Sequence, residues 1–255
     1  CWSILIIPMA MVFAFGFYIK RKKLAYTIYG VMLVAYLVGI CFAHHFEMAG
    51  NPRIDEMGIA QNIGSMEGKE MRIGAAGTAT WSQTTTVTSN GSVNGMHDST
   101  MPLTGMFTML NMMINCWFGG VGVGFMNYYT FLIIAVFISG LMVGRTPEFL
   151  GKKVEAREMK IASIVALCHP FIILVGTAIA AYLYAHAPGF VESEGGWLNN
   201  PSFHGFSEML YEYTSSAANN GSGFEGLGDN TYFWNFTCGL VLILGRYLPI
   251  VGQVA

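Results

Sequence analysis

The sequence predicts an all-α integral membrane protein built from repeated units of helix, short re-entrant helix, loop and helix. Of its 255 residues, 53% are hydrophobic and 11% are charged, whereas soluble domains carry about 25% charged residues. The apolar residues gather in long runs, as membrane-spanning helices require. Two short polar segments that both contain Asn-Gly-Ser lie beside such runs, at residues 88–94 and 217–224.

Five apolar runs are candidates for spanning helices, which need about 20 residues. They are residues 3–19, which is slightly short, 24–43, 122–144, 161–187, which contains Pro170, and 232–255, which contains Arg246. A weaker apolar stretch, residues 101–118, precedes the third run. Because the chain opens and closes inside apolar patterns, we expect it to be a segment of a longer protein.

The basic residues predict the orientation. Nine of the 13 lysines and arginines lie in two short connections, residues 20–23 and 145–160. Short loops rich in Lys and Arg stay on the cytoplasmic side, so residues 47–83 and 188–212 are expected outside. The second outer region is acidic and would weakly attract cations, although an ordinary solvated loop explains its composition equally well.

The order of the predicted elements indicates an internal repeat. The second span runs outward, the first polar segment follows an amphipathic stretch, and the third span runs inward. The same order recurs with the fourth span, a short half-polar helix at residues 207–218, the second polar segment and the fifth span. Gly91 and Gly221 lie 130 positions apart, which is a spacing typical of duplicated membrane units.

The two polar segments have the chemistry of a cation site. Irregular backbone at membrane depth is tolerated where it lines a watery path, and its carbonyls can replace the water shell of an ion. Glycine permits the positive φ that aims carbonyls inward, and the carboxyl end of a preceding helix favours a cation. With no carboxylate in either segment, a Ca²⁺ or Mg²⁺ cage is disfavoured. The candidate ligands are Thr88, Ser89, Asn90, Gly91, Asn219, Asn220, Gly221 and Ser222.

Simpler interpretations of the same segments stay open. Asn-Gly is also the commonest tight-turn dipeptide, and both Asn-Gly-Ser tripeptides match the glycosylation sequon. Their matched position after a short helix, in both units, favours the ion site.

A glycine-rich stretch and one arginine are candidates for the ion path. The glycines are Gly119, Gly120, Gly122 and Gly124. They predict a broken helix in mid-membrane that is available as a gate, with tight helix packing as the alternative. Arg246 lies deep in an apolar run, where a charge is a functional candidate unless it only reaches the interface or pairs structurally.

Other function classes find little support. The net charge of −2 gives no reason to expect nucleic acid, and the five scattered cysteines form no CxxC pair. His97, Asp98 and Ser99 are the residue types of a hydrolytic triad, but adjacent residues cannot generally assemble into one. A membrane-bound enzyme that uses His97 and Asp98 is therefore kept only as a minor hypothesis.

Six motifs carry a resemblance to a known family: residues 96–99 (Met-His-Asp-Ser), 118–122, 140–153 (Gly-Leu-Met-Val-Gly-Arg-Thr-Pro-Glu-Phe-Leu-Gly-Lys-Lys), 204–208, 219–224 and 233–235. They resemble the KdpA family, the potassium-translocating subunits of Kdp P-type ATPases. The resemblance implies the K⁺ transporter superfamily fold, with helix–pore helix–filter loop–helix repeats. Residues 1–23 would end the second repeat, 24–160 would form the third with its cytoplasmic loop, and 161–255 a truncated fourth.

The resemblance also implies roles. Ser89, Asn90 and Gly91 would belong to the third filter, Asn219, Asn220 and Gly221 to the fourth, and Arg246 would lie below the filter. Relatives often carry Cys or Thr where this chain has Asn90, and a glutamate near Asn115 or Cys116, where this chain has none.

The implied activity is high-affinity K⁺ uptake driven by ATP, with K⁺ as the transported ion, no organic cofactor and no ATP hydrolysis by this chain. The implied partners are a KdpB-type ATPase subunit, a KdpC-type subunit, a small membrane peptide and the lipid bilayer of a bacterial or archaeal cell (inner) membrane. The alternative is a stand-alone Trk, Ktr or HKT-type transporter, against which the run at 144–153 argues.

Overall fold

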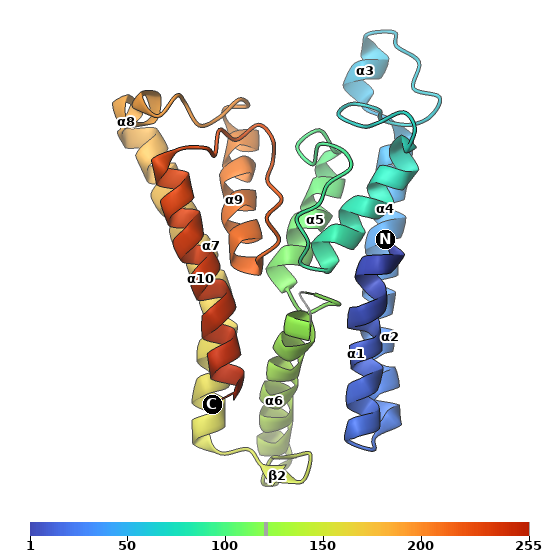
Figure 1. The fold of residues 1–255 in the computed structure, drawn as a ribbon, viewed down its shortest axis with the longest axis vertical. Helices are drawn as coiled ribbons and strands as arrows, with labels where there is room; N and C mark the ends of the chain where they lie inside the picture. Colours follow the sequence, from blue (N-terminus) through green and yellow to red (C-terminus); the bar gives the residue numbers. More distant parts are fainter. Residues whose placement is uncertain (120–121, 255) are drawn as a thin grey trace.

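The computed structural model describes residues 1–119 and 122–254, and its described part is mostly helical (Figure 1). Its elements are α1 (Trp2–Tyr18), α2 (Lys22–Ala49), α3 (Pro52–Glu56), α4 (Gly74–Val87), α5 (Pro102–Ile114), α6 (Val123–Val143), β1 (Glu148–Phe149), β2 (Lys152–Lys153), α7 (Ala156–His186), α8 (Pro188–Ser193), α9 (Phe203–Ala218) and α10 (Tyr232–Val254). Among the described residues, four helices, α2, α6, α7 and α10, are long and apolar enough to cross a membrane. The predicted all-α membrane fold is confirmed.

The long helices lie roughly side by side, and the short helices α4, α5 and α9 fill one half of the molecule between them (Figure 1). Helices α1, α2, α4 and α5 pack together, as do α7, α8, α9 and α10, and the α5–α9 contact joins the two groups. Helix α6 packs against α7 and α10 of the second group. The α1–α2 turn and the β1–β2 hairpin lie at the same end of the molecule. Both basic connections therefore face one side, as the orientation prediction requires.

The third span and the weaker stretch before it form two helices rather than one. Helix α5 ends at Asn115, which adopts the left-handed conformation, and α6 begins after Gly122, with φ 96°. A Cβ at Gly124 would lie 2.8 Å from the Gly119 nitrogen, so only glycine fits this close turn. Helix α10, at the equivalent place in the second group, is continuous.

Two differences from the sequence prediction concern helix starts. Helix α9 begins at Phe203, four residues before the predicted start of the short helix. Helix α7 begins earlier too, because Glu155 and Glu158 form a capping box that satisfies free backbone N–H groups. The capping box at the start of α7 is a local feature that the apolar pattern does not reveal.

Three buried apolar clusters hold the helices together. One centres on Trp197, Tyr213 and Trp234 between α7, α9 and α10. A second joins α1 and α2. The third contains Met112 of α5 and Tyr211 of α9, and therefore lies between the two repeated groups. Burial of large aromatic side chains makes such clusters the main source of packing energy.

A buried ion pair fixes the long connection between α3 and α4. Lys69 Nζ lies 2.9 Å from Glu47 Oε2, and neither side chain is exposed. Glu47 Oε1 accepts the Met101 N–H at 2.8 Å, and its carbonyl accepts the Ser65 N–H at 2.8 Å. One carboxyl residue at the end of α2 thus ties this connection to the start of α5.

Candidate functional site: two equivalent loops

The first Asn-Gly-Ser loop continues directly from the carboxyl end of α4. Ser89 has φ 50°, a left-handed conformation that turns the chain out of the helix. The Asn90 N–H donates to the Thr85 carbonyl at 3.0 Å. Thr85 Oγ1 lies 2.8 Å from the carbonyls of both Asn90 and Ser92. The last turn of α4 therefore holds the loop in place.

The second Asn-Gly-Ser loop repeats this geometry after α9. Asn219 has φ 58°, and the Asn220 N–H donates to the Ser215 carbonyl at 2.9 Å. The Gly221 N–H donates to Ser215 Oγ at 3.0 Å. Residues 85, 89 and 90 thus match residues 215, 219 and 220, the same 130-residue offset that separates the two glycines.

The two loops touch each other. Asn220 Nδ2 donates to the Thr86 carbonyl at 3.3 Å, and a Cβ at Gly91 would lie 2.5 Å from the Asn220 carbonyl oxygen. Gly91 has no positive φ, whereas Gly221 has φ 92°. The expectation that both glycines supply positive φ is therefore wrong for Gly91, where close approach of the loops excludes a side chain.

Most of the candidate ligands are shielded from solvent. Thr88, Asn220 and Ser222 are buried, and Ser89, Asn90 and Asn219 are half-buried. Asn220 Oδ1 is buried without a hydrogen-bond partner in the described part of the chain. The loops therefore gather neutral hydroxyl, amide and carbonyl oxygens at the carboxyl ends of two helices, a setting that suits a monovalent cation.

Arg246 contacts the second loop from α10. Its Nε donates to Asn219 Oδ1 at 3.0 Å, and Asn219 Nδ2 lies 3.3 Å from the Leu242 carbonyl. Within residues 1–119 and 122–254, Arg246 forms no ion pair with a carboxylate. No described carboxylate therefore neutralises the Arg246 charge, which lies beside Asn219, the residue that caps the carboxyl end of α9.

The glycine-rich break packs against the first loop. A Cβ at Gly119 would lie 2.7 Å from Ser89 Oγ, so the break and the loop are in direct contact. Gly122 and Gly124 shape the start of α6 as described above, and Gly120 lies outside the described residues. Of the predicted gate glycines, Gly119 is thus brought against the predicted filter.

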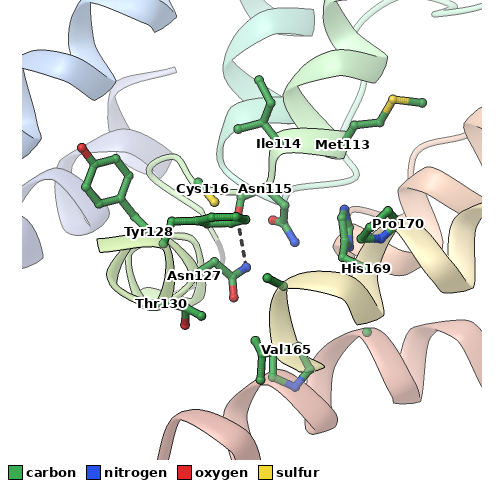
Figure 2. A pocket seen from close by; sticks show the side chains of 14 residues that line it. Met113, Ile114, Asn115, Cys116, Asn127, Tyr128, Thr130, Val165, His169 and Pro170 are labelled. Atoms are coloured by element: carbon green, nitrogen blue, oxygen red, sulfur yellow. Dashed lines mark hydrogen bonds between the residues drawn. The ribbon is translucent and has the colours of Figure 1, made fainter. Parts of the chain in front are cut away.

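A cavity of about 540 Å³ lies between the end of α5 and the helices α6, α7 and α10. Gly245 lines it, and a Cβ there would meet the Ala217 backbone at the end of α9. Figure 2 shows Asn115, Asn127 and His169 projecting toward the same space. The remaining lining is mostly apolar, so the cavity carries a few polar groups in an apolar wall.

The polar residues of this cavity were missed by sequence reasoning. Asn127 Nδ2 donates to the Asn115 carbonyl at 2.9 Å (Figure 2). Gln253 Nε2 lies 3.1 Å from both Asn127 Oδ1 and Thr130 Oγ1. Polar side chains inside apolar spans are unusual, and this could have served as a signal in the sequence. Only the structure shows that Asn127 and Thr130 of α6 meet Gln253 of α10.

His97 and Asp98 do not form a catalytic triad. His97 Nδ1 bonds the Tyr211 hydroxyl at 2.8 Å, and Tyr211 lies 3.1 Å from Ser222 Oγ in the second loop. Asp98 Oδ1 instead pairs with His204 Nε2 at 2.6 Å. The two side chains therefore serve different partners, and His97 supports the second loop through Tyr211.

His97 makes the stability of this region depend on pH. It lies outside the spanning helices, and its burial lowers its pKa from 6.5 to about 4. Because protonation then favours the unfolded state, stability present above pH 6.5 is lost as the pH falls toward 4. We expect this residue to contribute about 2 kcal/mol less stability at about pH 5 than at about pH 7.5.

The pH effect is measured by thermal unfolding of the full-length protein in detergent at both pH values. A His97→Asn variant should lose this share of the pH dependence, whereas His186→Asn, which alters an exposed histidine of α7, should keep it. Equal pH dependence in all three proteins would contradict the assignment.

The chain matches known proteins over its whole length. The family model of KdpA, "Potassium-transporting ATPase A subunit", matches residues 1–255. Proteins named potassium-transporting ATPase potassium-binding subunit are 82% identical in Phocaeicola vulgatus and 61% identical in Flavobacterium johnsoniae, over all of this chain and 45% of each relative. The one from Geobacillus kaustophilus is 46% identical over 98% of this chain and 43% of its own length.

The chain therefore spans less than half the length of the curated relatives it matches. The alignments with the Phocaeicola and Flavobacterium proteins cover all of this chain and therefore include both loops, the glycine break and α10. The resemblance read from the motifs is confirmed: this chain belongs to the KdpA family, the A subunits of potassium-transporting ATPases.

Proposed function

We propose that this chain supplies two of the four filter segments in the potassium-binding subunit of an ATP-driven K⁺ uptake complex. The observation that carries the proposal is the pair of equivalent loops, 130 residues apart, in direct contact at Gly91 and the Asn220 carbonyl oxygen. Each loop follows the carboxyl end of a short helix, each begins with a left-handed residue, and equivalent positions are 130 residues apart. Two unrelated turns would have no reason to agree in all three features. A repeated ion site accounts for all three.

In this mechanism K⁺ exchanges its water shell for oxygens of the two loops and of two further loops elsewhere in the full-length protein. The ligands are Thr88, Ser89, Asn90, Gly91, Asn219, Asn220, Gly221 and Ser222. The carboxyl ends of α4 and α9 add partial negative charge. Discrimination against Na⁺ follows from the number and field strength of neutral oxygens, since neither loop holds a carboxylate.

The cavity beside α6 offers the ion a place beyond the filter. Its wall includes Gly245, next to the end of α9. Gly119, at the start of the break that includes Gly122 and Gly124, lies against Ser89 of the first loop. We propose that this break gates entry and that Arg246 sets an electrostatic barrier on the same path. The proposed units are residues 1–23, 24–160 and 161–255, the end of one pore repeat and two successive repeats.

The relatives' name places them in an ATPase complex, and we propose the same for the full-length protein of this chain. A KdpB-type subunit would hydrolyse ATP and receive the ion, with a KdpC-type subunit and a small membrane peptide completing the complex in a bacterial inner membrane. This chain would need no organic cofactor and would hydrolyse nothing itself. Copurification with an ATPase subunit separates this function from that of a stand-alone Trk, Ktr or HKT-type transporter.

A Gly91→Ala variant of the full-length protein tests the loop contact. Its Cβ would overlap the Asn220 carbonyl oxygen, and overpacking costs about 1–3 kcal/mol. We expect the apparent K⁺ affinity to fall about tenfold or more. The measurement is radioactive rubidium uptake in cells that lack their own potassium pumps.

The control is Gly239→Ala in α10, where an added Cβ meets no atom within 4 Å. This variant should transport normally. If Gly91→Ala keeps full affinity while it is present in the membrane with its ATPase partner, the loops are ordinary turns and the proposed filter is wrong.

A further inference from the structure

A cluster of three metal-ligating side chains lies apart from the loops and the cavity described above. Asp98 comes from the connection after the first loop, whereas His204 and Glu208 lie one turn apart on α9. Their ligand atoms lie within 4.8 Å of one another. The cluster therefore joins the two repeated units at the end of the molecule opposite the basic connections (Figure 1).

The cluster contains a buried carboxylate oxygen that accepts no hydrogen bond from the described part of the chain. The Glu208 side chain has no exposed surface, and its Oε2 has no hydrogen-bond partner among the described residues. Its Oε1 lies 3.8 Å from His204 Nε2. A buried carboxylate without a full set of partners is costly, and a bound cation would relieve that cost.

Neighbouring groups add negative charge and supply further oxygen. Glu225 lies beside the cluster, because its two oxygens accept the N–H groups of His97 and Asp98 at 3.1 and 2.9 Å. Asn200 Nδ2 lies 3.3 Å from Asp98 Oδ2 and 3.0 Å from Glu208 Oε1. A half-turn of that amide would present its oxygen to the same point.

The spacing of the three side chains suits a small divalent ion. Ligands about 2.0–2.1 Å from a tetrahedral Zn²⁺ lie about 3.3 Å apart. His204 Nε2 lies 2.6 Å from Asp98 Oδ1 and 3.8 Å from Glu208 Oε1, so both of these spacings are within about 1 Å of the tetrahedral value. One imidazole with carboxylates favours a transition metal over Ca²⁺ or Mg²⁺, which prefer oxygen ligands alone.

An ion can reach the cluster. A cavity of about 290 Å³ is lined by Asp98 and His204, and the His204 side chain is 45% exposed. This cavity is distinct from the one beside α6, with which it shares no lining residue. Access is therefore from the surface and not through the filter loops.

We propose that Asp98, His204 and Glu208 form a binding site for a divalent transition metal that links the two repeats outside the ion path. Asn200 provides a further oxygen. The metal would replace the direct His204–Asp98 hydrogen bond with two metal–ligand bonds, and the site neither requires nor alters the proposed K⁺ ligands.

The test is equilibrium binding of radioactive Zn²⁺ to the full-length protein purified in its complex, in K⁺-containing buffer with excess Mg²⁺. We expect the unmodified protein to bind one equivalent more than His204→Gln. Loss of even an outer-shell partner lowers metal affinity about 10- to 100-fold, so loss of this ligand should cost at least as much. Co²⁺ at the same site should give visible ligand-field absorption that the variant lacks.

Two further variants test whether the lost Zn²⁺ equivalent belongs to this cluster. Asp98→Asn removes a second ligand from a different segment and should lose the same equivalent, whereas His186→Gln, on the exposed end of α7, should retain it. If His204→Gln and Asp98→Asn both bind Zn²⁺ as the unmodified protein does, the cluster is only an ion pair between repeats and the proposal is wrong. Because no transport is measured, this result is independent of whether the loops form the K⁺ filter.

Discussion

A Gly221→Asp substitution in the full-length protein is expected to abolish K⁺ uptake from low external concentrations. Gly221 has φ 92°, and holding a non-glycine residue in such a region costs about 1–3 kcal/mol. A cost of that size alone weakens binding about ten- to a hundredfold. The new carboxylate also places a full charge among neutral oxygens, so we expect the remaining uptake to discriminate less against Na⁺.

The measurement is growth and rubidium uptake at low K⁺ in cells that lack their own pumps, with and without competing Na⁺. Gly58→Asp is a matched control, because Gly58 also has a positive φ, 78°, and an added Cβ at either position meets no atom within 4 Å. It introduces the same side chain and comparable strain in the connection after α3. If Gly221→Asp transports like Gly58→Asp, with the complex intact, the assignment of Gly221 to the filter has to be abandoned.

Replacement of Glu47 by alanine is expected to cause the largest loss of stability. It leaves Lys69 buried without its partner, since both side chains have no exposed surface. Breaking a buried ion pair in this way costs about 3–5 kcal/mol. The Met101 N–H also loses its acceptor at the start of α5. We expect little folded protein in the membrane and a clearly lower melting temperature for what remains.

Two variants separate the buried pair from general sensitivity to charge removal. Glu56→Ala removes one partner of the exposed Arg53–Glu56 pair, whose side chains are 84% and 70% exposed, and exposed pairs contribute little. The double variant Glu47→Met/Lys69→Met removes both buried charges and should be more stable than Glu47→Ala alone. A Glu47→Ala protein as stable as Glu56→Ala would show that the pair does not hold this connection.

The family and the fold class could be predicted from the sequence because both depend on local pattern. Apolar runs of spanning length, two basic connections and the recurrence of Asn-Gly-Ser are properties of short segments. The offset between Gly91 and Gly221 predicted a repeat, and the structure gives both segments the same backbone hydrogen bond, from Asn90 to Thr85 and from Asn220 to Ser215. A local turn that follows a helix end depends on few neighbours, so its sequence is enough to reproduce it.

The sequence by itself thus determined the membrane class, four of the five predicted spans, the matching turns of the two loops and the family of this chain. The tertiary structure alone decided which residues meet across the repeats: Gly91 with the Asn220 carbonyl, Gln253 with Asn127, and Asp98 with His204. These partners are more than 100 residues apart. Their contacts depend on how whole helices pack against one another, and no periodicity or short motif records that packing.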